Sequence, residues 1–118
     1  MATVKQHLKK ATYNENFFDD IKETYPDWAI TGLFYSALHL IDAVLINMGC
    51  SAEDHKMRFQ YVKFIKELKP LYADYRALYD CSINARYKMT SDLNIESLND
   101  YHKKFFSPIK TTVTKLLN

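Results

Sequence analysis

The chain has 118 residues, the length of one domain, and we expect a single helical-bundle domain over residues 1–118. Its 47% hydrophobic content comes with only two glycines and three prolines, which excludes turn-rich β-sandwiches and barrels. The 16 basic and 14 acidic residues leave a net charge of +2, so specific DNA binding is not expected.

A first helix is predicted over about residues 3–24. Its apolar residues recur at steps of three and four, as on one face of an amphipathic helix: Val4, Leu8, Ala11, Phe18 and Ile21. Pro26 ends this helix, because proline disfavours a helical backbone at the residue before it. The same proline suits the first turn of the next helix.

The second helix, over about residues 27–48, is apolar on nearly every side, which is typical of a buried central helix. Gly49 fits the left-handed cap that ends it. Because the helix contains His39, Asp42 and Asn47, we expect a core helix and no membrane span.

A third helix, over about residues 51–70, is predicted to begin with Ser51 as its N-cap and to be closed by Pro70. A fourth follows over about residues 71–88. The segment TSDLN then predicts a loop and a new cap, and Pro108 should kink or divide the last helix, which begins at about Asn94. Short connections favour antiparallel neighbours, so the predicted fold class is all-α, an up-and-down bundle of about four or five helices.

No pattern in the sequence indicates a cofactor or a metal site. Cys50 and Cys81 are isolated, with no CxxC and no zinc-finger spacing, and there is no glycine-rich phosphate loop. We therefore expect no metal and no cofactor. With two cysteines and no signal sequence, the cytoplasm is the expected location.

Three polar residues interrupt the second helix in the stretch FYSALHLIDAVL. Tyr35, His39 and Asp42 lie at steps of four and three, so they form a polar line on one face. Burying such groups without partners would cost about 1–3 kcal/mol each, and more for a charged carboxylate. Two interpretations remain open: a core network whose members satisfy one another, or the wall of a polar cleft.

Two other helices supply polar residues that could meet this line. His55 and Arg58 share a face at the start of the third helix, and Ser82 and Arg86 share a face near the end of the fourth. We expect them to complete a cleft, with Arg86 as the first candidate partner of Asp42 and Arg58 as the second. The basic segments KMRFQYVKFIKELK and YHKKFF are interpreted as solvated helix faces.

Three segments, in this order, resemble the HEPN family, the higher eukaryote and prokaryote nucleotide-binding domains. They are FYSALH on the second helix, His55 at the start of the third, and SINARY, which ends in Arg86 and Tyr87, on the fourth. Ser82 and Arg86 stand where the family carries Arg and Asp. The ribonuclease members carry an Arg followed, after four to six residues, by a His, and no arginine of this chain is followed in that way.

The resemblance implies an α-helical, non-catalytic module that forms a dimer and acts in a prokaryotic defence or toxin-antitoxin context. A nucleotide, RNA or protein partner would bind in the polar cleft. The predicted binding residues are Tyr35, His39, Asp42, His55, Arg58, Ser82, Arg86 and Tyr87. One alternative is a metal-independent endoribonuclease whose catalytic candidates are His55, Arg58 and Arg86; another is a structural subunit or regulator of a larger complex.

Overall fold

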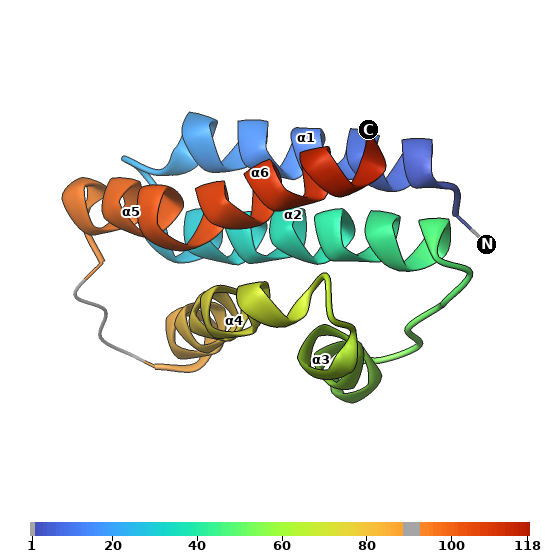
Figure 1. Cartoon of the computed structure of the whole chain (residues 1–118). Coiled ribbons are helices and arrows are strands. Elements are labelled where there is room, and N and C mark those ends of the chain that lie inside the picture. Colours follow the sequence, from blue (N-terminus) through green and yellow to red (C-terminus); the bar gives the residue numbers. More distant parts are fainter. Residues whose placement is uncertain (1, 89–92) are drawn as a thin grey trace.

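The protein is an all-α bundle, which confirms the predicted fold class (Figure 1). The computed structural model describes residues 2–88 and 93–118, and no strand occurs in these two ranges. The elements are α1 (Val4–Ile21), α2 (Pro26–Asn47), α3 (His55–Phe64), η1 (Lys69–Leu71), α4 (Tyr72–Tyr87), α5 (Ile95–Tyr101), η2 (His102–Phe106) and α6 (Ser107–Leu117).

Helix α2 forms the centre of the bundle. Helices α1 and α6 lie on one side of it, and α3 and α4 lie on the other, where they cross α2 at a steep angle (Figure 1). The apolar residues of α2, which occur on nearly every side of the helix, are buried against these neighbours. By length and composition α2 could cross a membrane, and 72% of its most apolar window is buried inside the bundle, as in a core helix.

The pair α1 and α2 is antiparallel and closely packed (Figure 1). Gly32 marks a close approach, because a Cβ at this position would lie 2.7 Å from Cδ2 of Phe17. Farther along the pair, the hydroxyl of Ser36 donates a 2.6 Å hydrogen bond to the carbonyl of Ala11. Gly49 then ends the second helix region with φ 81°, as its predicted left-handed cap requires.

Helix α3 is shorter at both ends than predicted. Asp54, and not Ser51, is its N-cap, with a carboxylate oxygen that accepts a 2.7 Å hydrogen bond from the amide of Met57. The helix stops at Phe64 because Ile65 has extended backbone angles, so Pro70 lies beyond it in η1. The early stop allows the chain to turn from α3 into α4.

The C-terminal region is divided, as Pro108 predicts. Asn94 caps α5 through a reciprocal pair of hydrogen bonds with Ser97, which confirms the predicted cap. Residues 90–92 of the predicted loop lie outside the described residues. A π-helical turn, η2, then separates α5 from α6, and Pro108 occupies the first turn of α6, where its missing amide donor costs least.

Candidate functional site

Each of the three polar side chains on α2 contacts a different helix. The pairs are Tyr35 with Arg86 of α4, His39 with His7 of α1, and Asp42 with Arg58 of α3. The polar line therefore meets three helices, and each of its side chains has a different hydrogen-bonding partner. The contacts of His39 and Asp42 are neighbours, because one ligand atom from each of His7, His39 and Asp42 lies within 4.8 Å of the other two.

Asp42 and Arg58 form a buried, bidentate ion pair. Nε of Arg58 lies 2.8 Å from one carboxylate oxygen and Nη2 lies 3.2 Å from the other, with side chains only 13% and 8% exposed. Burial opposes the charge on Arg58, but the hydrogen bond and the charge of Asp42 outweigh it and raise the pKa of the guanidinium. The fully buried Tyr75 lies in the field of this pair, and burial raises the pKa of its hydroxyl.

The prediction that Arg86 is the main partner of Asp42 is wrong, and the second candidate, Arg58, is the partner. The reason is where the helices cross. Tyr35, which Arg86 contacts, and Asp42 lie seven residues apart on α2, a distance of about 10 Å along the axis. Helix α4 brings Arg86 to the first position, and α3 brings Arg58 to the second.

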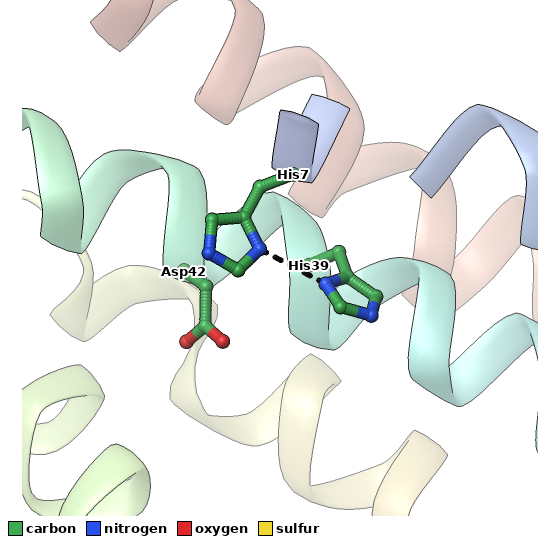
Figure 2. A group of neighbouring side chains, drawn as sticks. All are labelled: His7, His39 and Asp42. Carbon is green, nitrogen blue, oxygen red and sulfur yellow. Dashed lines mark hydrogen bonds between the residues drawn. The ribbon is translucent and has the colours of Figure 1, made fainter. Parts of the chain in front are cut away.

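His39 contacts a residue that the sequence analysis missed. Its Nδ1 lies 3.0 Å from Nδ1 of His7, so one ring donates a proton and the other accepts it (Figure 2). Burial, followed by the neighbouring His7, lowers the pKa of His39, and Asp42 opposes the change. One signal was present: His7 lies three residues after Val4 and four before Ala11, within the apolar stripe of α1.

Arg86 is half-buried, and its hydrogen-bonding partners within residues 2–88 and 93–118 are neutral. Its Nε and Nη2 lie 3.2 and 3.4 Å from the carbonyl and hydroxyl of Ser82, and Nη1 lies 3.5 Å from the hydroxyl of Tyr35. The guanidinium also lies over the rings of Tyr35 and Tyr87. Among residues 2–88 and 93–118, no carboxylate lies within 4.0 Å of it.

His55, the first residue of α3, is close enough to both Arg58 and Arg86 to be affected by their charges. Its ring packs against Phe34 and Tyr79, with ring centres 5.9 and 5.5 Å away. Burial lowers the pKa of His55, and the charges of Arg58 and then Arg86 lower it further. The two arginines thus act on one imidazole, although Asp42 already holds the first of them.

A groove of about 400 Å³ opens beside His55, between α3 and α4. Its walls combine aromatic rings with cations, and no carboxylate is among the lining side chains. The lining residues are His55, Lys56, Phe59, Gln60, Lys63, Tyr72, Arg76 and Tyr79. Of these, the sequence analysis named only His55 as a site residue. The signal for the others was the basic segment KMRFQYVKFIKELK, which was interpreted as a solvated face.

A second hollow, of about 240 Å³, lies at the far end of α4. Trp28, Arg86 and Lys88 line it together with Asp27. The carboxylate of Asp27 disfavours an anion in this hollow. The groove between α3 and α4 is therefore the better anion site of the two.

Comparisons with protein-family models, with curated proteins and with solved structures give no match.

We expect Arg58→Ala to lower the free energy of unfolding by about 3–5 kcal/mol, because it leaves the buried carboxylate of Asp42 without its partner. Chemical denaturation monitored by circular dichroism measures this change. Arg76→Ala is the matched control, since Arg76 pairs with Asp80 in an exposed contact worth about 0–1 kcal/mol. An Arg86→Ala variant as unstable as Arg58→Ala would contradict this assignment of the two arginines.

We expect the pKa of His55 to lie below its ordinary value of 6.5. In Arg86→Ala this pKa should rise. It should stay below 6.5, because burial of the ring still lowers it. NMR titration of the imidazole C–H resonances measures both values. Because the folded pKa lies below the unfolded one, the unfolded state binds the proton first. The contribution of neutral His55 to the free energy of unfolding is therefore present above pH 6.5, and it is lost as the pH falls toward the pKa of the folded state. An unchanged pKa in Arg86→Ala would show that the guanidinium does not act on this imidazole.

Proposed function

We propose that the chain is a non-catalytic, HEPN-like binding module that takes a nucleotide or a single strand of RNA in the groove between α3 and α4. The observation that carries this proposal is the lining of the groove, where aromatic rings and cations occur together without a carboxylate. We place the module in the cytoplasm of a prokaryote, in a defence or toxin-antitoxin context, as the resemblance implies.

The aromatic wall suits the bases of such a ligand. Phe59, Tyr72 and Tyr79 surround the groove, and the ring of Phe59 meets those of Tyr72 and Tyr79 edge to face at 6.2 and 5.0 Å. A base that stacks on such a ring contributes about 1–3 kcal/mol to binding, and the contribution tolerates any sequence because every base has a π-face.

The cations suit the phosphates. Lys56 and Lys63 are exposed, and Arg76 lies over the rings of Phe59 and Tyr79. Arg76 contacts Asp80 at 3.3 Å, but both side chains are about half exposed, so a phosphate can replace this weak partner. The planar guanidinium then offers paired hydrogen bonds to phosphate oxygens.

Arg86 extends the cationic surface along α4. It lies ten residues after Arg76, about 15 Å along the helix axis, with Tyr79 and Ser82 between them. Tyr35 and Tyr87 add rings beside Arg86. A strand of a few nucleotides, held first in the groove, would reach this second arginine.

In the ribonuclease alternative, one of the two candidate cations is already paired. Metal-free cleavage needs a general base and a cation that stabilises charge on the phosphorane. His55 could be the base, but Arg58 is buried in its pair with Asp42. This occupation, with the missing Arg-to-His spacing, favours binding without cleavage.

We expect the protein to bind a fluorescein-labelled oligouridylate and ATP at low salt, and Arg76→Ala and Lys56→Ala to weaken both. Each removed cation should also reduce the slope of log K against log salt for the RNA by about 0.7, as for single-strand phosphate contacts. Fluorescence anisotropy and calorimetry measure these changes. Lys104→Ala is the matched control, because Lys104 pairs with Asp100 at the distant η2 turn.

Affinity that Arg76→Ala and Lys56→Ala leave unchanged would place the ligand elsewhere. Metal-free cleavage of the RNA that is abolished by His55→Ala would favour the ribonuclease alternative. If neither RNA nor ATP binds at low salt, the nucleic-acid proposal fails and the protein-partner alternative replaces it.

We expect a symmetric homodimer that pairs through exposed aromatic residues near the start of α2. Phe17 packs beside Gly32, one turn from Trp28, and Trp28 shares a hollow with Arg86. Light scattering should give the dimer mass at micromolar concentration and the monomer mass for Trp28→Asp. Phe64→Asp is the control, since Phe64 is also exposed but lies at the end of α3. A monomer mass for the natural chain up to millimolar concentration would refute the dimer.

A further inference from the structure

Three side chains that bind metals well lie together where α1 crosses the second half of α2. One ligand atom from each of His7, His39 and Asp42 lies within 4.8 Å of the other two (Figure 2). This cluster is separate from the groove between α3 and α4, and none of these three residues lines that groove. An inference about the cluster therefore stands or fails independently of the proposed function.

The spacing of the imidazoles fits two ligands of one ion. Their Nδ1 atoms are 3.0 Å apart. Two nitrogens bound at about 2.0–2.1 Å to a tetrahedral Zn²⁺ would be roughly 3.3 Å apart. The ligand atoms of the cluster lie within 4.8 Å of one another, so the carboxylate completes the set after a movement of up to about 1.5 Å. His7 can supply part of that movement, since it is the fourth residue of α1, close to the helix start.

Arg58 prepares Asp42 for this role. Its two hydrogen bonds fix the plane of the carboxylate, and each oxygen keeps a second lone pair for another partner. A carboxylate oriented by a neighbouring group is a common feature of metal sites.

The cluster is open to solvent on one side. A hollow of about 240 Å³ is lined by His7 and Asp42, with Cys50 and Ser51 farther along its wall. An ion can enter by this route, and water can fill its remaining coordination positions. The thiol of Cys50 lies in the same hollow but is not among the three clustered ligand groups.

We propose that His7, His39 and Asp42 bind one divalent transition-metal ion of the Zn²⁺ class through two imidazole nitrogens and a carboxylate oxygen. Nitrogen ligands select Zn²⁺, Co²⁺, Ni²⁺ or Cu²⁺ over Mg²⁺ and Ca²⁺, which prefer oxygen. In the metal-free pair one ring carries its proton on Nδ1 and donates it to the other. When the ion binds both Nδ1 atoms, that proton moves to Nε2 of its own ring, so the neutral pair releases no proton.

This proposal differs from the expectation of no metal site, and the difference arises from the tertiary structure. The two histidines are 32 residues apart, so no short ligand motif exists in the sequence. The nearby charges of Lys10 and Arg58 act against a cation. Two neutral nitrogens and one carboxylate must outweigh them, which makes the affinity the quantity to measure.

The test is calorimetric titration of the full chain, freed of metal with a chelator, with Zn²⁺ and then with Mg²⁺. We expect one equivalent of Zn²⁺ per chain, no binding of Mg²⁺, and at least a tenfold loss of Zn²⁺ affinity in His7→Gln and in His39→Gln. His102→Gln is the matched control and should bind as the natural chain does. His102 is also half-buried and lies 2.9 Å from a carboxylate, that of Glu15, but has no second histidine. Cys50→Ser should also bind unchanged.

A second readout covers variants that fold less well. A 100-fold excess of Zn²⁺ should raise the melting temperature of the natural chain and of His102→Gln, and should raise that of folded His7→Gln by less. Two results would overturn the proposal: no binding of Zn²⁺ by the natural chain at 100-fold excess, which would leave a hydrogen-bonded histidine pair only, or binding that survives in both histidine variants and is lost in Cys50→Ser.

Discussion

The burial of one carboxylate in the central helix is the constraint on which the arrangement of α3 depends. Asp42 lies on a helix whose other faces are packed against apolar neighbours, and an unpaired charge there would cost several kcal/mol. Arg58 meets this cost with two hydrogen bonds. Because Arg58 is in the first turn of α3, the pair fixes the start of α3 under the second half of α2, and the groove between α3 and α4 opens beside it.

Because of this ion pair, the two arginines Arg58 and Arg86 have different roles. Arg58 is committed to Asp42, and its surroundings explain it completely as a structural residue. Within the described part of the chain, Arg86 has hydrogen bonds only to neutral oxygens of Ser82 and Tyr35. A cation with neutral partners keeps its affinity for an anion, whereas one in a buried bidentate pair does not. Of these two arginines, Arg86 on α4 is therefore the one that is available to a ligand.

Much of the fold could be predicted from the sequence, because local patterns determine it. The apolar run of α2, the glycine after it and the cap at Asn94 each depend on residues within a few positions. The partner of Asp42 could not be predicted in this way. Both arginines were chemically suitable, and the choice depends on where α3 and α4 cross α2.

The candidate site was predicted only in part, for the same reason. Tyr35, His39 and Asp42 could be placed on one face by helical spacing, but each turned out to contact a different helix. His7 and the aromatic residues of the groove fit the apolar faces of amphipathic helices. Core packing alone would account for them, so the sequence gives no sign that they form a site. Only the meeting of α1 with α2, and of α3 with α4, brings them into clusters with a chemistry of their own.

The interpretation as a purely structural subunit accounts for one of these clusters and not for the others. Packing requires the pair of Asp42 and Arg58, because without it a buried charge has no partner. Packing does not require Lys56, Lys63 and Arg76 to surround a groove lined by aromatic rings, since solvated lysines stabilise a helix equally well on any exposed face. Like charges around one hollow repel one another, and Asp80 offsets only the charge of Arg76, so a bound anion would reduce this repulsion. The distribution of charge supports the proposed ligand, whereas the buried ion pair supports only the fold.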